Sequence, residues 1–340
     1  KKLTLLILSK SQYKKGKNMS EANSKLPNLT AETEEFISKI EAADGQPLYK
    51  MTPQEARNFL KNLQSQTHKE ISANTTDTTI LTEAGNVDIR VVKPQHTEEK
   101  LPVILYLHGG GWILGGKESF DMLIKKLAVF TNSTVIFPDY SRSPEVQYPT
   151  ALNEIYAVLE YIFQNPEEFN IDPERIAIAG DSAGANMATV TALRTINKNG
   201  PKILFECLFY PVTNSDMDTK SYDLFKDGPW LSKKAMEWFW EAYVPDKKLR
   251  DDIYISPLKA EEEDLSKLPR TLIITAENDV LRDEGEAYAR KLDSAGVDVL
   301  NVRINGTIHD FLMLNALADT LPARGAMALA CTMLKKALHG

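Results

Sequence analysis

The chain has 340 residues, of which 43% are hydrophobic, and a formal net charge of −7. This length can bury the core of one large α/β domain with an accessory piece, and the acidic balance argues against a nucleic-acid partner. Its two cysteines, its scattered histidines and its lack of C-x-x-C and H-E-x-x-H patterns argue against a disulfide framework, a metal site and any other cofactor.

Residues 1–18 begin like a secretory signal, but the apolar run over residues 3–8 is short and no small-residue cleavage site follows it. Met19 comes directly after the lysine-rich stretch 14–18, so we expect residues 1–18 to be a disordered leader or an artefact of cloning. No later stretch approaches the roughly 20 apolar residues of a membrane span. We therefore expect a cytoplasmic protein without stable membrane association.

Two helices are predicted within residues 19–75, ahead of the first strand. Thr30 can cap one that runs to about Ala43, and Thr52-Pro53-Gln54-Glu55 has the pattern of a capping box with proline at the first helical position. These helices either pack against the body or form part of a lid over a site, and both interpretations stay open.

Residues 76–211 and 254–340 carry the pattern of an α/β body. The alternation over residues 80–92, around Gly85 and Asn86, predicts an edge hairpin. Short β-prone runs separated by helical segments indicate βαβ units and a mostly parallel central sheet flanked by helices. Helices are predicted from Thr150 and over residues 322–338, and strands over residues 103–107, 135–137, 175–179, 204–209, 271–275 and 297–304.

Residues 212–253 interrupt this alternation with an aromatic-rich insertion. Ser232 can cap a helix there, and we expect the apolar face of that helix to pack on the body rather than to line a pocket. Trp230 lies in a less regular stretch beside Gly228 and Pro229 and is the better pocket candidate. The helical face consists of Met236, Phe239, Trp240 and Tyr243.

The segment Gly180-Asp181-Ser182-Ala183-Gly184 matches the G-x-S-x-G pattern of a nucleophile elbow. It follows the predicted strand 175–179 and precedes a stretch of small, helix-compatible residues. A strand that turns directly into a helix needs small residues beside the serine, because the backbone approaches itself closely there. Ser182 is therefore the predicted nucleophile.

A serine nucleophile needs a base and an acid that orients the base, and in this fold they follow the serine in the order acid, then histidine. Only His309 and His339 follow Ser182, and His339 is the penultimate residue, so His309 is the predicted base. Asp279 comes just past the strand 271–275 and is the predicted acid. Glu277 and Asp283 compete with it, but Asp283 has the spacing of a helix N-cap.

The negative charge that develops on a substrate carbonyl oxygen must be met by N–H donors already in place. His108-Gly109-Gly110-Gly111-Trp112 directly follows the predicted strand 103–107 and matches the H-G-G-G loop that supplies such donors, with Ala183 as a further donor. A dinucleotide or phosphate loop also needs glycines, but its motifs are missing here.

Together these motifs resemble the hormone-sensitive-lipase-like family of α/β hydrolases, which includes bacterial esterases and arylacetamide deacetylases. The resemblance covers residues 101–340 and includes Asp139-Tyr140, Pro144-Glu145 and the run 279–285. It implies an α/β-hydrolase fold, oxyanion donors at Gly110, Gly111 and Ala183, and a helical cap built from residues 19–75 and 212–253. We place Trp112 and Trp230 in the substrate pocket.

Three positions depart from the family pattern. Asp310 stands where glycine usually follows the histidine, Ala185 replaces the glycine usual after the elbow, and Ser141-Arg142-Ser143 replaces the usual Arg-Leu-Ala. None of these changes removes a catalytic group, but Asp310 can alter the charge near His309 and the shape of the pocket.

These predictions converge on a serine carboxylesterase that hydrolyses short- to medium-chain esters through an acyl-enzyme intermediate. An amide deacylase similar to the arylacetamide deacetylases is the nearest alternative, since both reactions share the acyl-enzyme route. A ligand-binding protein on the hydrolase fold, as in the gibberellin receptors, is less favoured because His309 is present. The expected partner is a small-molecule ester, and a homodimer stays open.

Overall fold

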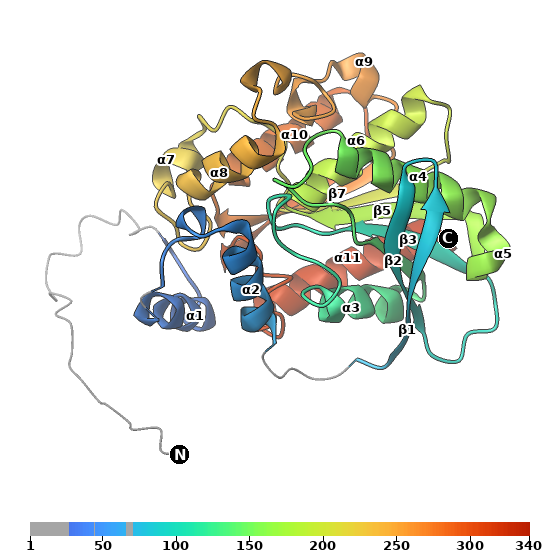
Figure 1. Ribbon diagram of the computed structural model, residues 1–340, viewed down its shortest axis with the longest axis horizontal. Coiled ribbons are helices and arrows are strands. Elements are labelled where there is room, and N and C mark those ends of the chain that lie inside the picture. The colour runs from blue at the N-terminus through green and yellow to red at the C-terminus, as the bar shows by residue number, and fades with distance from the viewer. Residues whose placement is uncertain (1–26, 44, 66–70) are drawn as a thin grey trace, which may run out of the picture.

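The computed structural model describes residues 27–43, 45–65 and 71–340, so the predicted leader 1–18 lies outside the described residues. Their fold centres on one eight-stranded sheet in the order β1-β2-β4-β3-β5-β6-β7-β8 (Figure 1). The strands are β1 (Ala73–Thr82), β2 (Gly85–Pro94), β3 (Leu101–Leu107), β4 (Thr134–Pro138), β5 (Ile171–Asp181), β6 (Phe205–Phe209), β7 (Arg270–Asn278) and β8 (Val299–Ile308).

The first two strands form the predicted edge hairpin, which pairs antiparallel with itself and, through β2, with β4. Its two-residue loop is Glu83-Ala84, slightly ahead of the predicted turn, because Thr82 Oγ1 accepts the N–H of Ala84 and donates to the carbonyl of Gly85. All other pairs are parallel, and β3 and β6 are buried along their whole length because helices cover both faces.

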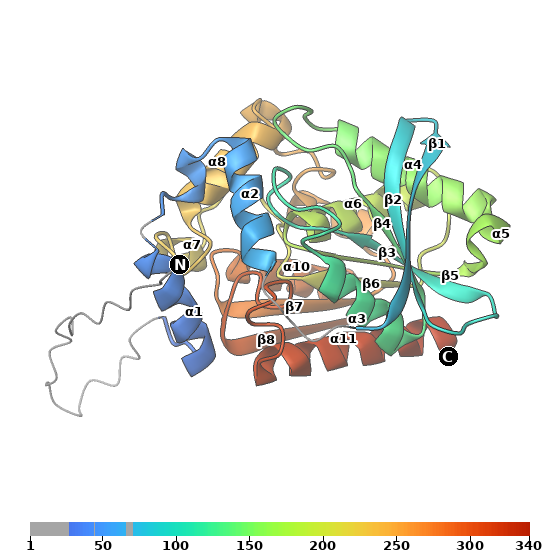
Figure 2. The same ribbon diagram turned by 60° about the horizontal axis from the view of Figure 1, so that its bottom comes forward.

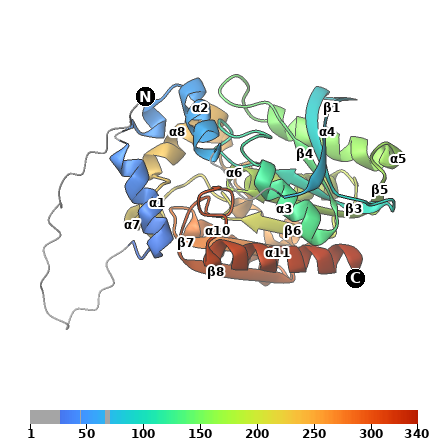
Figure 3. The ribbon, with the colours of Figure 1, turned by 90° about the horizontal axis from the view of Figure 1, so that it is seen from below.

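Helices cover the sheet in two layers (Figures 1 and 2). One face is covered by α3 and α11, which contact each other (Figure 3). The other face is covered by α4, α6 and α10. The bounds are α3 (Asp121–Thr131), α4 (Thr150–Gln164), α5 (Pro166–Phe169), α6 (Ala183–Asn197), α10 (Arg282–Ser294) and α11 (Leu321–His339). Sequence patterning predicted this mostly parallel α/β architecture correctly.

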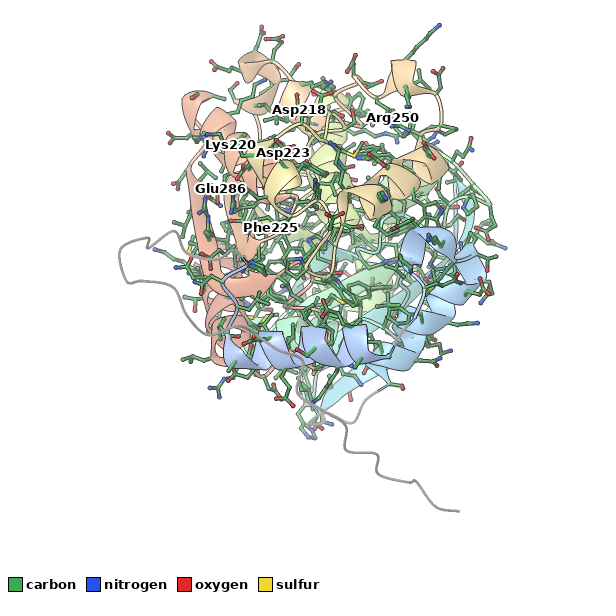
Figure 4. All side chains as sticks on the ribbon, turned by 90° about the vertical axis from the view of Figure 1, so that its left-hand side faces the viewer. Asp218, Lys220, Asp223, Phe225, Arg250 and Glu286 are labelled. Carbon is green, nitrogen blue, oxygen red and sulfur yellow. The ribbon has the colours of Figure 1, made fainter. Side chains whose placement is uncertain are left out.

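Two segments far apart in sequence gather beyond one end of the sheet (Figure 4). Three side-chain caps predicted for them are confirmed, because Thr30, Thr52 and Ser232 each accept an N–H three residues on, and Thr52 forms the full capping box with Glu55. Phe225, labelled in Figure 4, directly follows α7 and is buried. The elements are α1 (Ala31–Ala42), η1 (Leu48–Lys50), α2 (Pro53–Gln64), α7 (Lys220–Leu224) and α8 (Lys233–Tyr243), followed by η2 (Lys247–Leu249), η3 (Pro257–Lys259) and α9 (Glu262–Leu265).

Candidate active site

Ser182, Asp279 and His309 each lie one residue beyond the end of a parallel strand, namely β5, β7 and β8. The carboxyl ends of parallel strands meet at one edge of the sheet, which is where α/β enzymes bind ligands. The structure brings the three side chains together there, although up to 127 positions separate them in sequence.

Ser182 occupies a strained turn between β5 and α6, with φ 51° and ψ −121°. The flanking glycines make this turn sterically feasible. A Cβ on Gly184 would lie 2.0 Å from the carbonyl oxygen of Leu107, and one on Gly180 would lie 2.6 Å from the backbone of Gly184. The backbone N–H of Ser182 donates to Phe209 at 2.9 Å, which fixes the turn against β6.

A chain of short hydrogen bonds links the serine to the acid. His309 Nε2 lies 2.8 Å from Ser182 Oγ, and His309 Nδ1 lies 2.7 Å from Asp279 Oδ2. The other carboxylate oxygen of Asp279 accepts the N–H of Leu281 at 2.9 Å, which fixes the orientation of the acid. All three catalytic candidates are nearly inaccessible to solvent.

The competing residues take other roles. Glu277 accepts the N–H of Gly306. At the end of α11, His339 Nε2 lies 2.9 Å from the carbonyl oxygen of Thr131. The prediction that Asp283 caps a helix is wrong, because α10 begins at Arg282 and its N-cap position is Leu281, two residues before Asp283. The carboxylate of Asp283 instead accepts the N–H of Ser221 at the base of α7.

The two carboxylates beside His309 favour its protonated form. Burial alone would lower the pKa of His309, but the carboxylates of Asp279 and Asp310 outweigh burial and raise this pKa to about 9. Asp310 directly follows the histidine, and its Oδ1 lies 3.4 Å from His309 Nε2. The aromatic ring of Tyr210 packs edge-on against the imidazole at 4.8 Å.

Three backbone N–H groups lie where the sequence predicts an oxyanion hole. Gly110 and Gly111 have positive φ, and Ala183 is the first residue of α6, so its N–H has no acceptor within the helix. Among the turn, loop and cap hydrogen bonds of the described residues, none is donated by the backbone N–H of these three residues. The positive end of the α6 dipole adds a further preference for negative charge at this place.

Asp181 holds the glycine loop 109–111 in place through a hydrogen bond, a role that the sequence interpretation missed. Its buried carboxylate accepts the N–H of Gly109 at 2.9 Å and the hydroxyl of Tyr106 at 2.7 Å. Burial, and then the charge of Asp310, raise the pKa of Asp181 to about 8. A Cβ on Gly109 would lie 2.3 Å from Asp181, so the glycine allows the loop to approach the carboxylate.

An apolar pocket of about 30 Å³ lies beside Ser182. Trp230 contributes to its wall, but Trp112 does not. The ring of Trp112 is buried and stacks on Tyr243 at 4.3 Å, so placing Trp112 in the pocket is corrected. Most of the wall consists of apolar side chains from η1, α2, α8 and nearby loops, namely Leu48, Phe59, Leu60, Leu114, Trp230, Leu231, Phe239 and Met313.

Phe239 is a second residue that the sequence interpretation missed. Its helix α8 packs on the body as predicted for Met236, Trp240 and Tyr243, which are all buried. Phe239, from the same face, reaches the oxyanion loop, where a Cβ on Gly111 would lie 2.2 Å from its ring. Helical periodicity identifies the apolar face but not which of its residues meets the glycine loop.

Two polar side chains anchor α2 to both halves of the site. The guanidinium of Arg57 donates to the carbonyl of Ile113 at 2.8 Å, next to the glycine loop. The buried amide of Gln64 donates to Ser119 and Met313, both at 2.7 Å, and so joins the segment after the glycine loop to the segment after His309. Side-chain hydrogen bonds therefore bind both the first half and the end of α2 to the body.

The described residues offer neither a metal site nor a membrane-spanning helix. No group of three or more histidine, cysteine, aspartate or glutamate side chains there is arranged to hold a metal ion. Nor does any helix within residues 27–43, 45–65 and 71–340 have the length and hydropathy to cross a membrane.

Comparison with known proteins gives close matches over most of the chain. Residues 104–313 match the family profile of the alpha/beta hydrolase fold. Protein R526 of Acanthamoeba polyphaga mimivirus, which is named after that fold, is 38% identical over 329 residues, or 97% of this chain and 94% of the viral protein. Carboxylesterase NlhH of Mycobacterium tuberculosis is 36% identical over 259 residues, or 75% of this chain and 79% of its own. The crystal structure of a thermostable esterase from Pseudomonas putida ECU1011 has a TM-score of 0.91 at 41% identity, covering 92% of this chain and 99% of that chain.

Proposed function

This chain belongs to the hormone-sensitive-lipase-like family of α/β hydrolases, and from that premise we propose that it is a serine carboxylesterase. The observation that carries the proposal is the hydrogen-bonded series Ser182, His309 and Asp279, with links of 2.8 and 2.7 Å. The esterase names of its relatives support the same reaction class.

In the proposed acylation step, His309 Nε2 takes the proton of Ser182 Oγ as that oxygen attacks the ester carbonyl carbon. Asp279 holds the proton on Nδ1 and stabilises the imidazolium that forms. The carbonyl oxygen gains negative charge, which the N–H groups of Gly110, Gly111 and Ala183 stabilise. When the tetrahedral intermediate collapses, His309 gives its proton to the leaving alcohol.

Deacylation repeats these steps with water as nucleophile. Neutral His309 takes a proton from water, hydroxide oxygen adds to the acyl carbon, and collapse returns the proton to Ser182 as the carboxylic acid leaves. Because both half-reactions need neutral His309, activity falls as the imidazole becomes protonated on acidification.

The walls of the pocket support a small, uncharged acyl group. Leucine, phenylalanine and methionine side chains surround the serine, and the free volume of about 30 Å³ leaves little room for a long chain. A preference for short- to medium-chain esters therefore stays our proposal. The division into a body and a cap over residues 19–75 and 212–253 also stays a prediction, as do the homodimer and the cytoplasmic location.

The direct test replaces Ser182 with alanine and measures hydrolysis of p-nitrophenyl butyrate. We expect kcat/KM to fall by at least about 10⁴-fold while thermal unfolding changes little, because the oxyanion donors remain but the nucleophile is gone. Retention of most of the activity would contradict the assignment. Matched aryl ester and anilide substrates, compared on the unaltered protein, distinguish an esterase from an amide deacylase.

A further inference from the structure

The carboxylate of Asp310 lies between the catalytic base and the cap. Its Oδ1 is 3.4 Å from His309 Nε2, and its Oδ2 accepts the indole N–H of Trp230 at 2.9 Å. Asp310 has φ 65° and its side chain is only 17% exposed, so the backbone turn directs the carboxylate into the site.

The position of Oδ1 matters because Nε2 is also the nitrogen that contacts Ser182, at 2.8 Å. Once Nε2 is protonated, a carboxylate that moved a few tenths of an ångström closer would form a charge-assisted hydrogen bond with it. That bond would turn the imidazole away from the serine and stabilise the protonated form, which cannot act as a base. Asp310 is therefore a competitor of Ser182 for the same nitrogen.

Trp230 supplies the contact that restrains this competitor, and it belongs to the cap. Its ring packs against Phe36 of α1 at 5.6 Å and Phe59 of α2 at 6.5 Å. The indole N–H can reach Asp310 only while these cap segments lie over the site. Gln64, at the other end of α2, bonds the loop that follows Asp310, through the carbonyl of Met313.

We propose that Trp230 is a positioning residue that holds the Asp310 carboxylate away from His309, so that the histidine can serve Ser182 only while the cap covers the site. An open cap releases Asp310, which then pairs with His309 and leaves the serine without its base. This inference rests on the proposed function of Ser182 and His309, and it adds a requirement for cap closure to that function.

The other titratable groups facing His309 are Asp279, Asp181 and Tyr210. Asp279 is bound to Nδ1, on the opposite side of the ring from Nε2. Burial raises the pKa values of Asp181 and Tyr210, which favours their neutral forms. Asp310 is thus the carboxylate on the Nε2 side whose distance from the imidazole can change when its hydrogen bond to Trp230 is lost.

A double-mutant cycle tests the proposal. Trp230→Phe keeps an aromatic ring against Phe36 and Phe59 but removes the donor, whereas Asp310→Asn keeps an acceptor for Trp230 but removes the charge. Two quantities are measured for each variant and for the double variant: the pH dependence of kcat/KM for p-nitrophenyl butyrate, and the pKa of His309 from ¹⁵N NMR of the imidazole nitrogens.

We expect Trp230→Phe to lower kcat/KM at pH 7 about tenfold and to raise the pKa of His309 by about one unit, because the neutral fraction of the imidazole falls about tenfold for each unit of that rise. Asp310→Asn should lower that pKa by about one unit. In the double variant the loss caused by Trp230→Phe should disappear, because no charge remains to capture the imidazole.

An equal effect of Trp230→Phe in both backgrounds, or an unchanged pKa of His309, would overturn the proposal and make the contact merely structural. The NMR titration does not need turnover. If the unaltered protein hydrolysed no ester while the variants still shifted the pKa of His309 as stated, the proposed esterase function would fail and the Trp230–Asp310 restraint on His309 would stand.

Discussion

The edge of the sheet that carries the proposed triad and the segments that form the proposed cap are held in place by different interactions. Ser182, Asp279 and His309 directly follow parallel strands, and the backbone hydrogen bonds of the sheet set their separations. The proposed cap consists of short helices from two distant segments, and individual side chains such as Arg57 and Gln64 bind α2 to the body. In our proposal the sheet therefore fixes the positions of the catalytic groups, whereas a few side-chain contacts fix the access to them and the selectivity.

Substitution of the acid tests the sheet-borne half most severely. Asp279→Asn should reduce kcat by about 10⁴-fold, because an amide cannot hold His309 in the required tautomer or stabilise its charged form. Asp283→Asn is the matched control, since that carboxylate bonds Ser221 rather than His309, and it should stay within about threefold of the unaltered protein. Equal losses in the two variants, measured with p-nitrophenyl butyrate, would undermine the assignment of the acid.

Gly111 lies where the two regions meet. Gly111→Ala should lower kcat by about 10² to 10³-fold, because its φ of 60° and the ring of Phe239 at 2.2 Å from the new Cβ force an oxyanion donor out of place. Gly325→Ala, in α11, adds the same methyl group where no atom lies within 4 Å and should leave kcat unchanged. A Gly111→Ala enzyme with full activity would remove this loop from the oxyanion hole.

The positions of the sheet-borne residues could be predicted because each depends on local pattern and strand order. The role of Asp283 could not be predicted in this way, because Asp279 sets the start of α10. The carboxylate of Asp279 accepts the N–H of Leu281, and the backbone carbonyl of Asp279 accepts the N–H of Arg282 at 3.2 Å. Trp112 follows the glycine loop directly, but its φ of 59° is part of a turn that sequence alone does not define, and its ring lies on Tyr243.

Cap residues should change selectivity more than chemistry. Phe239→Leu removes part of the ring that closes the pocket, so the rate ratio for octanoate over butyrate p-nitrophenyl esters should rise about tenfold, corresponding to about 1.4 kcal/mol. The exposed Phe130 on α3 provides the control, and Phe130→Leu should leave the ratio unchanged. An unchanged ratio in the Phe239 variant would remove Phe239 from the acyl pocket.

The smallest expected effect concerns the stability of the sheet. Burial raises the pKa of Glu206 in β6 to about 8, from an ordinary value of 4.5. The folded state therefore holds a proton that the unfolded state releases, and Glu206 makes the protein less stable as pH rises from about 4.5 to about 8.

Glu206→Gln removes this dependence. The difference in Tm between the variant and the unaltered protein should therefore be a few degrees more in favour of the variant at pH 8.5 than at pH 5.5. Exposed Glu174→Gln should show no such gain. Calorimetric scans of both variants at the two pH values make the comparison, and a constant difference in Tm for Glu206→Gln would refute the assigned proton.

The central claim is that Ser182 carries the acyl group and that His309 places it there. The most direct measurement mixes the protein with p-nitrophenyl acetate, quenches with acid within the first turnover and locates the acetyl group by peptide mass spectrometry. We predict acetylation of Ser182 in the unaltered protein and almost none in His309→Gln. A burst of p-nitrophenol with the acetyl group on another residue, or equal labelling of Ser182 without His309, would contradict the account.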